Sequence, residues 1–311
     1  MVAMKVPWYA IWGYGAHIKS TPGLLYVQKR AQQSSYSIDA INHLLLVGGH
    51  TIQTATINRL LEKGASISFF DAHGTPLGTL TPFGTSKNEE TWCLQTSAPS
   101  HRYVLEFVRS SMKSRLLWLE ELDKSLESGL FYRGEHDVLV QSQSEIEYLV
   151  RIEEIRRLHT LTTDMYYEIL SRMLPSALDY RRRTRRPHFD PVNSMLSFGY
   201  ALLFGNACVA IIGAHLNPDH GLLNQGAGGL VYDIIEPLKR TMVDSTVFEL
   251  ARESITKADY ELSQTRCVLS DELVSRLLER LYTTIDQKII DTNVYAYLNS
   301  LEKGREFSYV F

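Results

Sequence analysis

The sequence predicts an α+β protein in which a small β-rich N-terminal domain, residues 1–95, precedes a larger all-α domain, residues 96–311. Two observations support this prediction. Short apolar runs separated by Gly, Pro and Asp turn signals fill the first 95 residues, which is typical of strands. Beyond a polar segment at Thr85–Glu90, which we expect to link the domains, apolar residues recur at three- and four-residue steps.

The strands predicted for the N-terminal domain are Trp8–Trp12, Leu24–Val27, His43–Val47 and Ser66–Phe70. One helix interrupts them, because Thr51–Glu62 places apolar side chains at near-helical spacing and Gly64 follows where a helix would end. Gly48-Gly49-His50 and the pair Asp71 and His73 are interpreted as residues that shape turns and a dimer contact, not as a metal or phosphate site.

The helices predicted for the second domain are Tyr103–Leu122, Ser142–Leu174, Asp271–Thr284 and Ile289–Leu301. Met195–Leu216 is a further long and strongly apolar segment, which passes a simple test for a membrane span. Ser197, Asn206 and several small residues interrupt it, and a helix that is apolar on all sides is typical of a protein core. We therefore predict a fully buried core helix and no membrane association.

The composition excludes several classes of protein. With 311 residues, 44% of them hydrophobic and 22% charged, the chain has the make-up of a soluble globular protein of one or two domains. A net charge of −3 argues against a wholly basic nucleic-acid coat but allows a local basic groove. Three widely spaced cysteines without a CxxC pair, and no signal-peptide pattern in the first thirty residues, predict a cytoplasmic protein.

The densest cationic segment has five arginines in six positions next to Tyr180: Arg181, Arg182, Arg183, Arg185 and Arg186. Guanidinium groups stay charged at any relevant pH and their planar fork matches phosphate oxygens, so the run predicts contacts with a DNA backbone. Lys239 and Arg240 are candidates for an extension of this cationic strip. Asp233 and Glu236 lie three apart on a predicted helix, hence on one face, and form either solvated surface or a metal- or DNA-facing pair.

Five segments carry a family resemblance. They are Thr184–Leu203, which contains TRRP followed by DPVN, Leu216–Leu223 (LNPDHGLL), Asp233–Lys239 (DIIEPLK), His43–His50 (HLLLVGGH) and Ile67–Gly78 (ISFFDAHGTPLG). In this order they resemble the Cas-one family, the DNA integrase of CRISPR adaptation. The resemblance implies an N-terminal β domain that mediates homodimerisation and a helical domain with a divalent-metal site. It also implies DNA cleavage and strand transfer, usually with a small partner called Cas-two.

The resemblance also implies three metal-ligand positions, which the family fills with a glutamate, a histidine and an aspartate around magnesium or manganese. In this chain the three positions are His159, Asn224 and Asp233. An imidazole in place of a carboxylate, and a neutral amide oxygen in place of an imidazole, remove negative charge and a nitrogen donor from the site. We therefore expect weak or absent binding of magnesium, and no catalytic residue is assigned.

The sequence thus predicts a diverged homodimeric member of this family that binds branched or double-stranded DNA through Arg181–Arg186 and cleaves it little or not at all. One alternative is an active manganese-dependent nuclease or integrase with a rearranged ligand set of His159, His220, Asp233 and Glu236. Another is a non-catalytic structural subunit of an adaptation complex, which pairs with the Cas-two protein or an intact paralogue and does not touch DNA.

Overall fold

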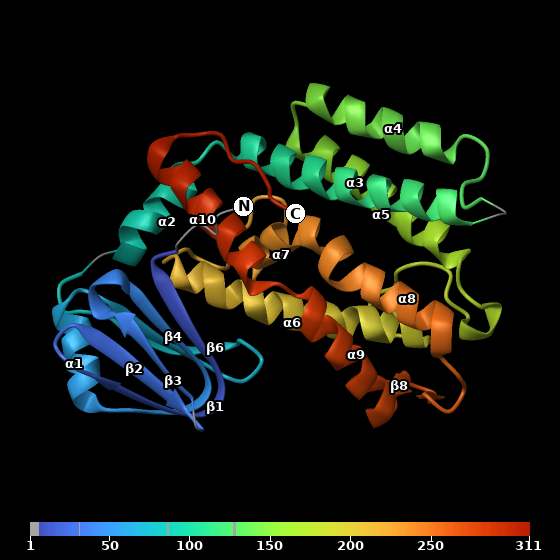
Figure 1. The fold of residues 1–311 in the computed structure, drawn as a ribbon. Coiled ribbons are helices and arrows are strands. Elements are labelled where there is room, and N and C mark those ends of the chain that lie inside the picture. Colours follow the sequence, from blue (N-terminus) through green and yellow to red (C-terminus); the bar gives the residue numbers. More distant parts are fainter. Residues whose placement is uncertain (1–5, 31, 86, 127–128) are drawn as a thin grey trace. The chain divides into compact units, whose positions relative to one another are not determined.

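A six-stranded mixed sheet forms the N-terminal part of the computed structural model, which describes residues 6–30, 32–85, 87–126 and 129–311 (Figure 1). The spatial order is β3-β2-β1-β4-β5-β6, and only the pairs β1–β4 and β4–β5 are parallel among the described strands. The strands are β1 (Trp8–Ser20), β2 (Leu24–Lys29), β3 (Gln32–Ser37), β4 (His43–Ile52), β5 (Ser66–Phe70) and β6 (Pro76–Leu80). Helix α1 (Thr54–Glu62) connects β4 to β5, and a short helix η1 (Ile38–Ala40) precedes β4.

The predicted α+β class is confirmed, because helices fill most of the chain beyond this sheet (Figure 1). The described residues form two compact units that are not contiguous in sequence. Unit 1 combines the first 98 residues with Phe204–Tyr232 and Gln287–Val310, and unit 2 combines Pro99–Leu203 with Asp233–Asp286. These units differ from a simple division at residue 95, since two later segments belong with the sheet.

The four predicted strands are present as β1, β2, β4 and β5, but β1 runs past the expected end at Trp12. Gly13, Tyr14 and Gly15 lie inside β1, whose register against β4 shifts between Tyr14 and His17, as at a β-bulge. His50 holds this irregularity: its Nδ1 accepts from Ala16 N at 3.3 Å, so its Nε2 carries the proton and lies 3.1 Å from the carbonyl oxygens of Ile11 and Val47. Gly48-Gly49-His50 therefore lie within β4, which corrects the predicted turn.

The loop between β5 and β6 is a turn, as expected for Asp71 and His73. Asp71 Oδ1 accepts hydrogen bonds from His73 N at 2.8 Å and from Thr75 N at 2.9 Å. The turn packs closely on a later helix, because a Cβ placed on Gly205 would lie 1.8 Å from the His73 carbonyl oxygen. A glycine is therefore required at position 205.

The long apolar segment forms helix α6 (Pro191–Gly213), the described helix that is long and apolar enough for a membrane span by composition. Of its most apolar window, 61% is buried inside the protein, so the helix lies largely in the interior but is not the fully buried helix that was predicted. Its last residue is tied to the sheet: His43 Nδ1 lies 3.3 Å from the Gly213 carbonyl and Nε2 lies 2.8 Å from Ser68 Oγ. Burial, and the neighbouring His215, lower the pKa of His43 to about 3, so this histidine is neutral.

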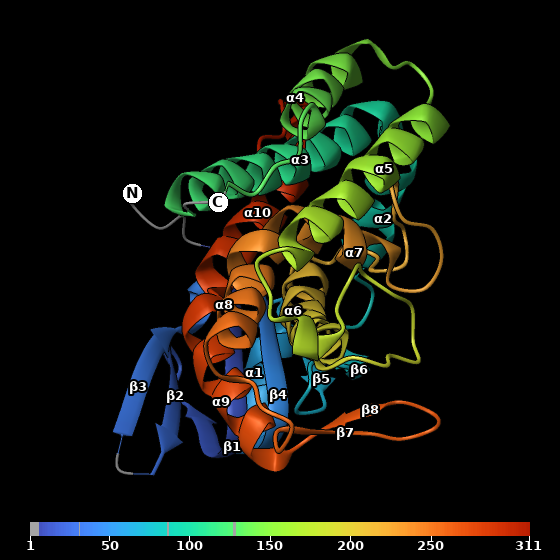
Figure 2. The ribbon, with the colours of Figure 1, turned by 90° about the vertical axis from the view of Figure 1, so that its right-hand side faces the viewer.

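Unit 2 consists of helices and one short hairpin, and α3 and α5 run side by side in it (Figure 2). Its helices are α3 (Ser100–Ser125), α4 (Glu135–Glu145), α5 (Ile152–Ser171), α8 (Ser245–Ser254) and α9 (Asp271–Thr284), with the hairpin β7 (Tyr260–Leu262) and β8 (Cys267–Leu269). Helix α9 has the predicted bounds. The single helix predicted over Ser142–Leu174 is wrong, because η2 (Ile146–Tyr148) and an extended Leu149 separate α4 from α5.

Helices α2 (Lys87–Ser97) and α10 (Gln287–Lys303) belong to unit 1. The predicted linker Thr85–Glu90 is wrong over most of its length, because α2 begins at Lys87. Ser86 lies outside the described residues. A short helix η3 (Ser176–Leu178) follows α5 and leads into the arginine-rich loop.

Candidate nucleic-acid interface and metal site

The segment that carries the acid pair is helical but irregular. Helix α7 (Gly229–Ile235) continues into a 3-10 turn, η4 (Glu236–Leu238), and a π-helical turn, η5 (Arg240–Asp244), before α8 begins. Pro237 has no backbone N–H to continue the α-helical pattern, and π turns widen a helix locally and occur often at functional sites. Three acids of this segment are buried: Asp233, Glu236 and Asp244. The interpretation of Asp233 and Glu236 as part of a solvated surface is therefore wrong.

Glu236 lies in a cluster of cationic groups within unit 2. Arg115 of α3 donates from its NH2 group to Glu236 Oε1 at 2.7 Å, and His159 Nε2 of α5 lies 3.2 Å from the same oxygen. Lys239, one turn further along, donates to Oε2 at 2.5 Å. Thr163 fixes Arg115 from the other side, since its Oγ1 accepts from the NH1 group at 2.7 Å. We call Arg115, His159, Glu236 and Lys239 the Glu236 cluster.

The charges of this cluster keep Glu236 ionised. Burial alone would raise its pKa, but the charges of Lys239 and Arg115, together with the hydrogen bond from His159, hold the pKa well below the usual range. Because Glu236 Oε1 is an acceptor, His159 Nε2 carries the proton in this contact. A buried carboxylate thus lies next to three positively charged or proton-donating groups.

Asp244, at the end of the π turn, lies among phenol groups. Tyr166 donates to Oδ2 at 2.9 Å, Tyr200 of α6 makes a short hydrogen bond to Oδ1, and Tyr167 lies 2.5 Å from the Tyr200 hydroxyl. Burial raises the pKa of Asp244, and the charge of Arg115 and the tyrosine hydroxyls offset only part of that increase. We call these four residues the Asp244 cluster.

The donor set at the Glu236 cluster differs from the one that a hard dication prefers. Magnesium selects several anionic or neutral oxygens, whereas Glu236 is met by an imidazole and two cations. Across the described ranges, no group of three or more His, Cys, Asp or Glu side chains is arranged to hold a metal ion. His159 occupies the family's glutamate position, and the acid that it contacts is Glu236, which the sequence analysis had paired with Asp233 and had also placed in the alternative ligand set.

Two of the predicted ligand positions, Asn224 and His220, lie in unit 1. His220 Nε2 donates to the Gln95 carbonyl at 3.2 Å, so this nitrogen has no lone pair for a metal. Asn224 lies in a tight glycine loop, because a Cβ on Gly221 would come within 2.0 Å of the Asn224 carbonyl oxygen. Asn224 is therefore a residue of this loop.

The arginine-rich loop divides its side chains between two roles. Arg183 points inward: its NH1 group donates to Asn193 Oδ1 at 2.7 Å, its NH2 group donates to Ser197 Oγ at 2.6 Å, and its guanidinium lies over the ring of Tyr200. The other four side chains are exposed: Arg181, Arg182, Arg185 and Arg186. Asn193 anchors the loop, since its amide also accepts from Thr184 N and donates to the Arg182 carbonyl.

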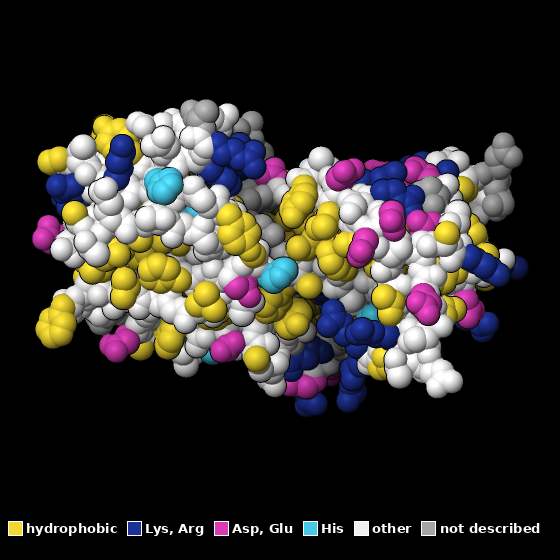
Figure 3. Space-filling model, turned by 90° about the horizontal axis from the view of Figure 1, so that it is seen from below, with side chains coloured by type: hydrophobic (Ala, Val, Ile, Leu, Met, Phe, Trp, Pro, Cys, Tyr) yellow, Lys and Arg dark blue, Asp and Glu magenta, His cyan; other side chains and the backbone are white. Residues whose placement is uncertain are grey.

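Lys239 and Arg240 are less available than the exposed arginines. Lys239 is bound to Glu236, and Arg240 donates to Glu121 at 3.1 Å while lying over the ring of Trp118. Their side chains are 18% and 21% exposed, so neither extends far into solvent. Figure 3 shows one face of the molecule, on which Lys and Arg side chains gather in groups next to exposed hydrophobic ones.

Sequence reasoning did not identify Arg115, which joins both clusters electrostatically. A signal was present, because Arg115 lies three residues after Met112 and four before Leu119, on the buried face of α3. A cation in the middle of an apolar helical face needs a buried anion. The identity of that anion could not be read from the sequence.

Comparison with known proteins identifies the family to which this chain belongs. The model of the family described as CRISPR associated protein Cas1 matches residues 9–283. The chain belongs to the Cas1 family. A putative CRISPR-associated endonuclease Cas1 of Methanospirillum hungatei is 37% identical over 299 residues, which cover 96% of this chain and 99% of that protein.

Solved structures share the fold of this Cas1-family chain. A casposase bound to its integration product superposes with a TM-score of 0.80 at 18% identity, covering 96% of both chains. A chain of a partial Cas6-RT-Cas1–Cas2 complex gives 0.79 at 21% identity, covering 97% of both. At these identities the likeness establishes the architecture, while the family membership establishes a CRISPR endonuclease and integrase lineage.

Proposed function

We propose that this member of the Cas1 family binds branched or double-stranded DNA and cleaves or joins it little or not at all. The observation that carries the proposal is the contact between His159 and Glu236 at 3.2 Å, with Arg115 and Lys239 on the same carboxylate. A carboxylate at position 159 would add an anionic oxygen beside Glu236. The imidazole adds a neutral or positive group, so magnesium and manganese are held weakly or not at all.

DNA is the proposed ligand of the exposed arginines. Four guanidiniums point outward from a loop that Asn193 and Asp190 hold in place, with Asp190 Oδ1 accepting from Asn193 N at 2.6 Å. A loop whose backbone is held in place can present its arginines to successive phosphates at a smaller cost in backbone conformational freedom. Arg183 supports the loop from within, so we assign DNA contact to the other four members of the run and only a minor share to Lys239 and Arg240.

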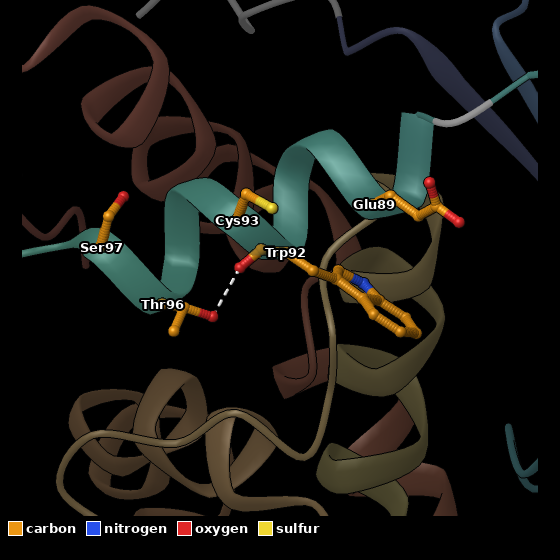
Figure 4. Close-up of a pocket in the computed structure, with 5 residues that line it drawn as sticks. All are labelled: Glu89, Trp92, Cys93, Thr96 and Ser97. Carbon is orange, nitrogen blue, oxygen red and sulfur yellow. Dashed lines mark hydrogen bonds between the residues drawn. The ribbon is translucent and has the colours of Figure 1, made fainter.

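Protein partners are proposed for unit 1. Apolar side chains are exposed on β6 and after it, where Leu77 is 71% exposed and Phe83 fully exposed. A depression of about 490 Å³ lies on α2 beside Trp92, a residue that is 42% exposed, and Figure 4 shows the side chains that line it. Such surfaces suit protein contacts, and we propose homodimerisation through residues 1–95. We further propose association with Cas2 or an intact paralogue, in the cytoplasm, since a structural relative comes from a Cas1–Cas2 complex.

A binding experiment without divalent cations tests the DNA proposal. The double variant Arg182→Glu, Arg185→Glu should bind duplex and branched DNA about tenfold or more weakly, with a shallower dependence of affinity on salt. The matched control is Arg252→Glu, Lys257→Glu, which reverses two exposed cations elsewhere in unit 2. Equal affinities for the two double variants would contradict the proposal, and absence of any DNA binding would favour a purely structural subunit.

A cleavage assay tests the catalytic half of the proposal. We expect no nicking or strand transfer above background with magnesium. Robust nicking that Glu236→Gln abolishes would contradict the proposal. The contact of His159 with Glu236 also motivates a second candidate, a manganese-dependent enzyme, because an imidazole nitrogen that gives up its proton would form an adjacent nitrogen–oxygen donor pair with this carboxylate. Anomalous scattering from manganese between these two side chains in a crystal would establish that alternative.

A further inference from the structure

Two neighbouring side chains are the most exposed large hydrophobic residues of unit 2 in the described ranges. Tyr148, at the end of η2, is 83% exposed, and Val150 is 81% exposed. Leu149 between them is extended and half-buried, so its two neighbours point to the same side. A tyrosine presented in this way is typical of the residues that anchor protein interfaces. We call Tyr148 and Val150 the apolar knob.

The backbone that carries the apolar knob is held by helix α3. Arg109 of α3 binds Glu147 through two nitrogens, with Nε at 2.5 Å from Oε1 and the NH2 group at 2.7 Å from Oε2. His101, also on α3, donates from Nε2 to the Leu149 carbonyl oxygen at 2.7 Å. A segment that is already fixed loses little conformational freedom when a partner covers it.

The side chains that flank the apolar knob in sequence are mostly acidic. Residues 145–154 contain four exposed glutamates and a single exposed arginine: Glu145, Glu147, Glu153, Glu154 and Arg151. Such a surface repels a DNA backbone and attracts a cationic protein surface. The complementary partner of the apolar knob is therefore a protein with an apolar cavity that has cations at its rim.

Unit 2 itself contains a cavity of this kind. A groove of about 720 Å³ lies between the end of the arginine-rich loop, the first turns of α6, and β8 with the start of α9. Phe198, Ala201 and Val268 line it with apolar atoms, whereas Arg186 and Arg266 are exposed cations. Among the described residues, no Asp or Glu lines the groove and no ion pair engages either guanidinium. We call it the cationic groove.

The cationic groove has a defined shape and enough room for the knob. Cys267 N of β8 donates to the His188 carbonyl at 2.7 Å, and His188 Nε2 lies 2.6 Å from Ser197 Oγ, which ties the walls together. Burial and nearby arginines lower the pKa of His188 to about 4, so its imidazole is neutral and the two rim arginines supply the charge. Sites of this volume bury whole small molecules, so the groove can hold a tyrosine and a valine side chain.

We propose that the apolar knob of one copy of this chain inserts into the cationic groove of a second copy. The knob covers Phe198 and Val268, and the glutamates beside it face Arg186 and Arg266. Knob and groove are different surfaces of the chain, so the contact is head-to-tail and can add further copies to the homodimer proposed through residues 1–95. The contact does not depend on DNA binding, although it covers Arg186 and so competes with the proposed DNA contact of that arginine.

Sedimentation velocity of the full chain without DNA, at low salt and over a range of protein concentrations, tests the contact. The wild-type protein should form species larger than those present at low concentration. The double variant Tyr148→Ser, Val150→Ser removes the knob, and Arg266→Glu reverses a groove cation, so each should weaken this association about tenfold or more. The matched controls Tyr282→Ser, at a side chain that is 74% exposed, and Arg252→Glu, at an exposed cation on α8, should associate like the wild-type protein.

An equimolar mixture of the two variants gives a second measurement. The Tyr148→Ser, Val150→Ser variant keeps its groove and Arg266→Glu keeps its knob, so the mixture should associate through one contact although neither variant does so alone. A mixture that sediments like the separate variants would overturn the proposal, as would wild-type sedimentation that is independent of concentration. An equal loss of association in the control variants would overturn it as well. None of these results affects the proposed DNA binding.

Discussion

Two buried carboxylates in one short helical segment have opposite surroundings. Glu236 contacts Arg115, His159 and Lys239, and its pKa lies well below the usual range. Asp244 contacts the hydroxyls of Tyr166 and Tyr200, and its pKa is raised. Burial disfavours the charged form of both acids, so the charges and hydrogen bonds of the neighbours decide the direction in which each pKa moves. The charges of Lys239 and Arg115 outweigh desolvation at Glu236, whereas the charge of Arg115 and the phenol hydroxyls offset only part of it at Asp244.

The largest loss of stability is expected from a substitution of Arg115, a buried cation that contacts Glu236. Arg115→Met should lower the free energy of unfolding by about 3–5 kcal/mol, because it leaves a buried carboxylate without its guanidinium. Denaturation by urea measures this. The matched control is Arg280→Met, whose partner Glu253 is exposed and whose loss should cost about 0–1 kcal/mol. Similar losses for the two variants would show that Arg115 and Glu236 are not a coupled buried pair.

A smaller effect is expected at the Asp244 cluster. Tyr166→Phe should lower the free energy of unfolding by about 1–3 kcal/mol, because one hydroxyl donor to a buried acid is lost without a change in shape. Tyr282→Phe is the control, since that side chain is 74% exposed. If both substitutions were neutral, the phenols would not be stabilising Asp244.

The pH dependence of stability should separate the two acids. Glu236 has a lowered pKa, so it contributes stability above its unfolded pKa that is lost as pH falls, and the cost of Glu236→Gln should shrink in acid. Asp244 has a raised pKa, so the folded state is penalised as pH rises through that value, and the cost of Asp244→Asn should shrink towards neutral pH. Unfolding by urea at several pH values measures both slopes, and slopes of the same sign would contradict the comparison.

The sequence predicted much of the fold because its patterns are local. The bounds of helix α9 follow from its own apolar spacing, and Ser270, the residue before it, caps the helix by accepting a hydrogen bond from Leu273 N. Strands β3 and β6 were missed, since QQSSYS is polar and PLGTL begins with proline, so neither shows the apolar alternation of a buried strand. They form the two edges of the described sheet, where side-chain packing places the weakest constraints on residue type.

The site was predicted less completely, because its contacts join distant parts of the chain. The position of His159 was found through the resemblance, but its contact with Glu236 depends on how α5 packs against η4. The sequence could not show that Arg183 is the arginine of the run that points inward. Its role depends on hydrogen bonds to Asn193 and Ser197, which only the folded structure reveals. Periodicity reports which residues are buried, and it does not report which buried charges meet.

Protein cations already balance the negative charge of the Glu236 carboxylate, and we propose that it does not capture magnesium. Calorimetric titration of MgCl₂ into the purified full chain tests it most directly. We predict no saturable heat of binding at millimolar magnesium, and the same flat titration for Glu236→Gln. A saturable transition with one ion per chain that Glu236→Gln removes would contradict the claim.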